Sequence, residues 1–498
     1  MCTVKIAEML AIEESAFANG WTEEQLINLA GERLGRALGR YFPSPGTVVG
    51  YLGKGHNAGD ALVALRVLRE EFGWKIATRN AYPLGECIPL MRKKWDELGI
   101  PVPMDRSPDW RDFEGPLILL DGLLGSGAAG PLREPLLHLA HEMASLRETA
   151  GAKVASIDLP SGIDPDSGQI LPNAVVANIT FMIGSAKVGL LKGHACNATG
   201  ALALVPVEPL TRSRITDDTL ISPQTLDWGK RHRPFDFHKG MAGRVTILAG
   251  SLDYSGAAVL AAMGALRGGA GLVTLFVPKI ARKLIASKCP PEIIVRDFYN
   301  PRELIEERFD ALVVGCGLKD LDGETAEGLL ELIANSRNPS VIDAEALNLI
   351  AKKGKLGLLT DKHILTPHQG EFSRLAPDLV GLAREDAARL FANRVPSTLL
   401  LKGSRTIVTR RDLPVFYNST GNPAMATGGL GDVLAGVIAA FLANKTSPVE
   451  AACLSAWICG RAAEIAMNQP NISEESLLPS DVLHFLGAAF VDWKTSRR

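Results

Sequence analysis

The chain has 498 residues, 46% of them hydrophobic and 22% charged, with 53 basic residues against 55 acidic ones. This length exceeds one ordinary hydrophobic core, so at least two domains are expected, and the apolar content excludes a disordered chain. The balanced charge gives no bulk attraction to nucleic acid.

The chain carries no pattern typical of a membrane span or a secretion signal. Its longest uncharged helical run, residues 433–443, has about half of the roughly 20 residues that a span requires. Residues 1–20 contain charged side chains where a signal peptide would be apolar. The seven cysteines show no disulfide or zinc spacing. We therefore expect a cytoplasmic protein with buried free thiols and no membrane partner.

The first half alternates short apolar runs with helical ones, a rhythm typical of βαβ units. The runs PLILLDGLLG (116–125) and AKVASIDLPSG (152–162) each contain an acid followed by glycine or by leucine and proline. This pattern places Asp121 and Asp158 at the carboxyl ends of parallel strands, where open α/β sheets bind ligands.

The run GKGHNAGDA (53–61) follows a predicted strand and opens a predicted helix. Its glycines, Gly53, Gly55 and Gly59, suit a turn whose backbone amides cradle phosphate. In the usual dinucleotide-binding fold, an acid stands some 20 residues after the glycine-rich turn. Arg79 and Asn80 stand there instead, which disfavours a standard NAD dehydrogenase.

Between residues 205 and 240 the alternation lapses into a polar stretch with four prolines. We place a linker at about 210–235 and predict two domains, residues 1–215 and 216–498. Beyond the linker, strand-like and helical runs alternate again, so the second half is predicted to be another α/β domain.

The run ATGGLGDVLAG (426–436) opens the apolar helical segment. Its glycines allow a ligand to approach the backbone, and the helix amides favour an anion. Asp432 would lie beside that anion as a proton acceptor. A stabilising acid at a helix N-terminus is the alternative interpretation.

Several further segments accompany this run, including HKGMAGRVTILAGS, VIDAEALN, LTPHQGEF and LLKGSRTIV. Together, over most of residues 238–465, they resemble the ribokinase-like dehydratase half of the NAD(P)H-hydrate repair enzymes. The resemblance implies dehydration of NADHX and NADPHX with ADP or ATP, magnesium as cofactor, and Asp432 as the base. It also implies nucleotide binding by Lys402, Gly403, Ser404, Arg405, Thr406 and Gly431, and hydrate binding by Ala257, Gly317, His368 and Asp432.

Residues 45–205 resemble the Rossmann-like epimerase half of the same family, through GHNAGDA, LDGLLGSGAAGP and SIDLPSGIDPDSG. This resemblance implies that Asp158 interconverts the R and S hydrates, and that potassium is bound by Asn57, Asp121 and Ser161. The hydrate-binding positions that it implies are His56, Asn57, Ala58, Gly59, Asp60, Gly125, Ser126, Gly127, Ala128, Ala129, Gly130, Pro131 and Asp158.

Some residues depart from the family pattern. Ala58 and Ala61 would be strained wherever the loop needs a positive φ, and Leu430 replaces a small residue between two glycines. His368 and Glu371 have a simpler interpretation as turn and helix-cap residues, and Cys316 as a packing residue.

The two resemblances together imply a bifunctional enzyme for small-molecule substrates, NADHX and NADPHX. We expect no nucleic-acid partner and a homo-oligomeric state. Three alternatives remain at this point. The second domain could be a small-molecule kinase, the first could be a non-catalytic binding module, and a redox dehydrogenase is disfavoured by the missing acid.

Overall fold

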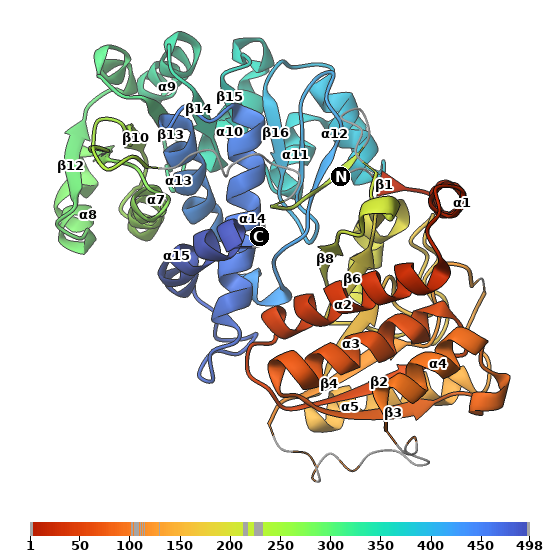
Figure 1. The fold of residues 1–498 in the computed structure, drawn as a ribbon. Helices are drawn as coiled ribbons and strands as arrows, with labels where there is room; N and C mark the ends of the chain where they lie inside the picture. The colour runs from red at the N-terminus through yellow and green to blue at the C-terminus, as the bar shows by residue number, and fades with distance from the viewer. Residues whose placement is uncertain are drawn as a thin grey trace. The chain divides into compact units, whose positions relative to one another are not determined.

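The computed structural model describes residues 3–100, 103, 109, 111, 113, 115–128, 130–212, 218–223 and 233–495. Two compact units divide the chain, Met1–Ile215 and Thr216–Arg498 (Figure 1). Within the described ranges, every helix is too short or too polar to cross a lipid bilayer.

The first unit contains a six-stranded parallel sheet in the order β3-β2-β4-β5-β6-β8. The fully buried β2 and β4 are nearly continuous apolar runs, as expected for a parallel sheet covered on both faces. The strands are β2 (Thr47–Leu52), β3 (Lys75–Asn80), β4 (Leu117–Gly122), β5 (Lys153–Ile157), β6 (Ile179–Ile183) and β8 (Ala201–Val205).

Helices cover this sheet on both faces, which makes the unit three-layered. One core lies under α2 (Glu23–Tyr41), α3 (His56–Phe72) and α4 (Pro89–Leu98), and the other lies under α5 (Leu136–Ala150). The glycines of α2 bring it close to α3, since a Cβ on Gly31 would come within 2.5 Å of Val63 Cβ.

The strand order reverses between β2 and β4, because β3 pairs with one edge of β2 and β4 pairs with the other, both in parallel. This is a topological switch point, at which a crevice opens outside the carboxyl ends of the strands. The N-terminus of α3 and Asp121, near the end of β4, lie at this crevice. The first unit also contains the helix α1 (Ile6–Ala18). A separate two-stranded parallel sheet pairs β1 (Thr3–Val4) with β7 (Ala186–Lys187).

The second unit contains a ten-stranded sheet in the order β12-β11-β10-β13-β14-β15-β16-β17-β18-β9. The pairs from β12 to β16 are parallel, and β17 pairs antiparallel with both of its neighbours. The strands are β9 (Thr219–Ile221), β10 (Arg244–Leu248), β11 (Leu272–Pro278), β12 (Ile293–Phe298), β13 (Ala311–Val314), β14 (Ser340–Ile342), β15 (His363–Leu365), β16 (Thr398–Leu401), β17 (Ile407–Thr409) and β18 (Phe416–Asn418).

The long uncharged run of the sequence is the helix α13 (Leu430–Ala443), which packs against α7 (Ser255–Arg267) and the sheet. All residues from 433 to 443 are buried, because this helix shares one apolar core with α14 (Pro448–Ala466) and α15 (Pro479–Thr495) (Figure 1). The other helices are α8 (Arg282–Lys288), α9 (Gly323–Asn335), α10 (Ala344–Lys353), α11 (Gln369–Leu375) and α12 (Arg384–Ala392).

One strand lies where the sequence pattern indicated only a linker. β9 pairs in parallel with β18 and forms an edge of the second sheet. Asp218, just before it, pairs with Arg389 of α12 and accepts the Val415 N–H at 3.2 Å. Three residues are too few to show a period, so the sequence alone did not indicate this strand.

Candidate active sites

In the first unit, a buried carboxylate stands at the carboxyl end of β4. Asp121 is fully buried, and its oxygens accept hydrogen bonds from Ser161 Oγ at 2.7 Å, Ser161 N at 2.9 Å and Ser156 Oγ at 2.9 Å. Burial raises the pKa of Asp121, although the bonds from Ser161 oppose this effect. Within the described residues, no cationic side chain pairs with it, so a cation would satisfy this charge.

Asn57 lies next to this carboxylate network. Its Nδ2 donates to the Leu124 carbonyl at 2.9 Å, and the Leu124 N–H donates to Ser161 Oγ at 3.0 Å. The fold therefore brings Asn57, Asp121 and Ser161 together from three separate segments. All three offer oxygen, which potassium prefers.

The two segments predicted to bind the hydrate also lie side by side. A Cβ added to Gly125 would be 3.4 Å from Asn57 Cβ, and Gly125, Ala128, Gly130 and Gly162 are among the residues that line a cavity of about 20 Å³. Ser126, Gly127 and Pro131 belong to the same segment. Ala129 lies outside the described residues.

The segment from His56 to Asp60 is helical, whereas the sequence suggested that Gly59 belongs to the turn. α3 begins at His56, so Ala58 and Ala61 have ordinary helical backbone and neither has a positive φ. The strain that these alanines would cause in a loop is therefore absent at both positions. Gly59 instead gives room to Ile27 of α2, 3.3 Å from an added Cβ.

Asp158 follows β5 with a φ of 67°, in the left-handed region that few non-glycine residues adopt. Its Oδ1 accepts the Ile183 N–H at 3.1 Å and the ammonium group of Lys187. Such backbone strain persists where the surroundings hold it, often at functional sites. Lys187 lies 29 residues away in the chain, and no motif in the sequence marked it as a site residue.

In the second unit, α13 presents its N-terminus to the carboxyl ends of the central strands. Gly429 caps the helix with a φ of 100°, which glycine adopts without strain. Asp432 lies in the first turn, and burial raises its pKa to about 7, with a further contribution from the charge of Asp343. Leu430 points into the hydrophobic core and is buried.

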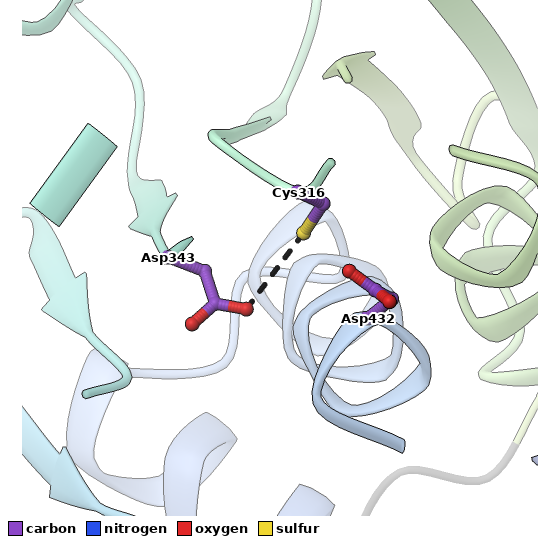
Figure 2. A group of neighbouring side chains, drawn as sticks. All are labelled: Cys316, Asp343 and Asp432. Atoms are coloured by element: carbon purple, nitrogen blue, oxygen red, sulfur yellow. Dashed lines mark hydrogen bonds between the residues drawn. The ribbon is translucent and has the colours of Figure 1, made fainter. Parts of the chain in front are cut away.

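The strands β13 and β14 add two side chains to this position. Cys316 and Asp343 follow these strands, and their Sγ and Oδ2 atoms are 3.8 Å apart (Figure 2). Three residues, Cys316, Asp343 and Asp432, each offer one ligand atom, and these atoms all lie within 4.8 Å of one another. The group could therefore hold a metal ion. Burial and the two carboxylates raise the pKa of Cys316 well above its ordinary value, which agrees with a packing role rather than a nucleophilic one.

Lys402, after β16, brings a positive charge to the same place. Its Nζ donates to Asp343 Oδ1 at 2.9 Å and is 3.8 Å from Glu371 Oε2. Although burial lowers the pKa of Lys402, these two carboxylates outweigh it and the net shift is upward. A Cβ on Gly431 would be 3.3 Å from the same Nζ, so the predicted nucleotide residues Lys402 and Gly431 meet.

The turn from β16 to β17, residues 403–406, is covered by Arg384 of α12. The guanidinium of Arg384 donates to the carbonyls of Leu401, Lys402 and Arg405 at 3.1 to 3.2 Å. Thr406 Oγ1 donates to the Gly403 carbonyl at 3.2 Å, which closes the turn. Ser404 is exposed on it.

The predicted hydrate-binding positions of the second unit lie in two places. Ala257 of α7 is next to Gly317, since a Cβ on Gly317 would be 2.7 Å from Ala257 Cβ. His368 caps α11, where its Nδ1 accepts a hydrogen bond from the Gly370 N–H at 2.9 Å. The His368 N–H in turn donates to Glu371 Oε2 at 2.8 Å. The capping interpretation of Glu371 is confirmed, whereas His368, interpreted as a turn residue, is the N-cap itself. Glu371 additionally faces Lys402.

Asp343 and Arg384 were not identified in the sequence analysis, although VIDAEALN was noted as a family segment. Asp343 follows a three-residue strand, and its role depends on β14 lying beside β13 and near α13. An acid at a strand end was the one available signal.

Fold and sites together define a two-domain α/β protein, with a Rossmann-like first unit and a ribokinase-like second unit. Residues 245–484 match the family model described as NAD(P)H-hydrate dehydratase, and residues 23–189 match YjeF-related protein N-terminus. The chain is 35% identical over 489 residues to the bifunctional NAD(P)H-hydrate repair enzyme Nnr of Gloeobacter violaceus, covering 92% of each chain.

It is also 35% identical over 478 residues to the enzyme of the same name from Methanopyrus kandleri, covering 92% of this chain and 91% of the relative. An ADP/ATP-dependent NAD(P)H-hydrate dehydratase from Bacillus subtilis, crystallised with ATP and Mg²⁺, is 27% identical. The match covers 53% of this chain and 94% of that one, with a TM-score of 0.46. The chain belongs to the family of bifunctional NAD(P)H-hydrate repair enzymes.

Proposed function

We propose that this protein returns the hydrates NADHX and NADPHX to NADH and NADPH, using two separate active sites. In this proposal, residues 216–498 dehydrate the S hydrate at the expense of ADP or ATP, and residues 1–215 interconvert the R and S hydrates. Family membership supports the pair of activities.

The observation that carries the proposal is the position of Asp432. Its carboxyl lies at the N-terminus of α13, among the carboxyl ends of the central strands, with a pKa of about 7. A base with a pKa near the working pH combines a useful ionised fraction with a useful proton affinity. Asp432 would accept the proton of the C6 hydroxyl as that oxygen attacks the terminal phosphoryl group, with AMP or ADP as the leaving group. Phosphate would then leave C6 while C5 loses a proton, which forms the C5–C6 double bond.

The remaining residues of this site would bind and neutralise charge. Backbone amides at Gly431 and the positive end of α13 suit phosphate oxygens. Lys402 adds a cation that is 2.9 Å from Asp343, and the turn held by Arg384 would receive the rest of the nucleotide. Ala257, Gly317 and His368 would line the hydrate pocket.

Magnesium fits this site, because the Asp343 carboxylate offers oxygen next to the position proposed for the nucleotide phosphates, while Asp432 stays free to act as the base. When bound with the nucleotide, magnesium would neutralise phosphate charge and orient the terminal phosphoryl group.

In the first unit, Asp158 would exchange a proton with the C6 hydroxyl of the hydrate. Residues 56–60 and 125–131 would bind the phosphates of the substrate at the N-terminus of α3. The contact between Gly125 and Asn57 supports their common role.

Potassium fits the site of Asn57, Asp121 and Ser161, because the fully buried Asp121 has no cationic partner among the described side chains. The ion would supply a positive charge that holds the substrate-binding loops together. Replacing K⁺ by tetramethylammonium should slow epimerisation and leave dehydration unchanged.

A single assay tests the proposal. Mixed R and S NADHX is supplied with ADP or ATP and Mg²⁺, and the return of nicotinamide absorbance is followed. Full recovery, faster than spontaneous epimerisation permits, is expected, with phosphate release and no stable phosphorylated product. A stable phosphorylated product would instead identify a kinase, and rapid recovery of only the S fraction would exclude the epimerase.

A further inference from the structure

Lys187 is a buried cation that the proposed reaction does not yet use. It ends the short strand β7, is 1% exposed, and donates through Nζ to the Ile183 carbonyl at 3.0 Å and to Asp158 Oδ1. A lysine is almost never fully buried unless it is paired. Its partner is the side chain assigned above as the acid or base of epimerisation.

The contacts of Asp158 are distributed unequally over its two oxygens. The Ile183 N–H, at 3.1 Å, and the Lys187 ammonium both bind Oδ1. Within the described part of the chain, no hydrogen bond reaches Oδ2. The pair therefore fixes the carboxylate by one oxygen and leaves the other for a ligand.

Two more acids face this pair. Glu13 of α1 and Asp60 of α3 both have raised pKa values, for which burial is the main cause and the charge of Asp158 a further one. The charge of Lys187 opposes the shift at both. Oδ1 of Asp60 is buried without a hydrogen-bond partner in the described structure. Lys187 is thus a cation set among three carboxyl groups.

We propose that Lys187 is the positioning residue of the epimerase site, holding Asp158 by Oδ1 so that Oδ2 exchanges a proton with the C6 hydroxyl of the hydrate. This inference rests on the proposed epimerase function of Asp158. Oδ2 takes the hydroxyl proton, the C6–N1 bond breaks to give an aldehyde, and N1 keeps the electron pair and receives the proton. Closure on the opposite face reverses these steps, so atoms and electrons balance.

The removal of this cation has a direct consequence for Asp158. Its carboxylate loses one of the two hydrogen bonds that hold Oδ1, so the orientation of Oδ2 is less defined. Proton transfer at Oδ2 should therefore slow, whereas substrate binding by the other segments should change little.

The test compares Lys187→Met, Lys187→Arg and the control Lys153→Met in the full-length protein with R-NADHX as substrate. Lys153 is exposed at the start of β5. We expect Lys187→Met to lower kcat about a hundredfold with KM within about threefold. Lys187→Arg should recover at least tenfold of that loss, and Lys153→Met should match the wild type.

Each result has a defined meaning. A wild-type kcat in Lys187→Met would overturn the inference while the epimerase function stands. If Lys187→Met does not fold, Lys187→Arg is decisive, because a kcat like that of the wild type supports positioning by charge, and an inactive but folded protein contradicts it. No epimerisation by the wild type would refute the proposed function itself.

Discussion

At the scale of single residues, the two proposed reactions use carboxylates in opposite surroundings. Asp432 stands among Asp343 and Glu371, and its pKa is raised to about 7 by burial first and by like charge second. Asp158 is instead paired directly with a buried lysine. Environment, rather than residue type, thus sets what each carboxyl group can do.

The raised pKa of Asp432 predicts how dehydration depends on pH. A base must be ionised to accept a proton, so kcat/KM for S-NADHX should fall as the pH drops below about 7, by about tenfold per unit. Initial rates from pH 5.5 to 8.5 with saturating nucleotide measure this limb. A rate that stays constant down to pH 5.5 would show that Asp432 is not the base.

Substitution of Asp432 separates catalysis from helix stabilisation. Asp432→Asn keeps the shape but cannot accept a proton, so dehydration should fall by about two to four orders of magnitude. A carboxyl whose pKa rises on folding contributes stability below its unfolded pKa, about 3.9, and loses it as the pH rises through 7. At pH 8, Asp432→Asn should therefore melt no lower than the wild type.

The matched control for this variant is Asp322→Ala. Asp322 caps α9 by accepting the Thr325 N–H at 2.7 Å, so its loss should cost about 1 kcal/mol of stability and leave turnover unchanged. If Asp432→Asn behaved in the same way, with lowered melting temperature and preserved turnover, Asp432 would be a stabilising helix acid only.

At the scale of elements, one short strand, β9, marks where the second unit begins. β9 has three residues, yet it covers β18, and Ser419 Oγ donates to the Ile221 carbonyl at 2.8 Å. An uncovered strand edge exposes unpaired backbone groups and favours aggregation. The second unit therefore requires residues that the sequence pattern assigned to a linker.

Truncation tests this requirement. A fragment of residues 216–498 keeps β9 and Asp218, and should fold and dehydrate S-NADHX. A fragment of residues 222–498 lacks them and should aggregate or melt several degrees lower. Gel filtration, thermal melts and turnover of both fragments are the measurements, and equal behaviour would show that β9 contributes nothing.

At the scale of the whole molecule, the two chemistries occupy units with separate cores. The first unit has its two apolar clusters on the faces of its own sheet, and the second has a cluster built on α7, α13 and α14. Each site is formed at the carboxyl ends of its own parallel strands. Damage to one site should therefore leave the other unaffected.

Asp158→Asn tests this independence. The variant should lose R-to-S conversion by at least about a hundredfold and should dehydrate S-NADHX at the wild-type rate. Both reactions are measured on the same preparation, so a folding defect would appear in both. Retained R-to-S conversion would remove Asp158 from the reaction, and a parallel loss of dehydration would show that the two sites are coupled.

The sequence by itself determined the βαβ order, the strand ends that carry Asp121 and Asp158, and the glycine-bordered helix start at Asp432. Periodicity and turn residues are local signals, so they survive in one dimension. Only the tertiary structure brought Asp343 to Lys402 and Lys187 to Asp158. The members of these pairs are 59 and 29 positions apart in the chain, so their contact depends on the order of the strands. A buried charge is costly unless an opposite charge pairs with it, and here the fold supplies a partner that is distant in the sequence.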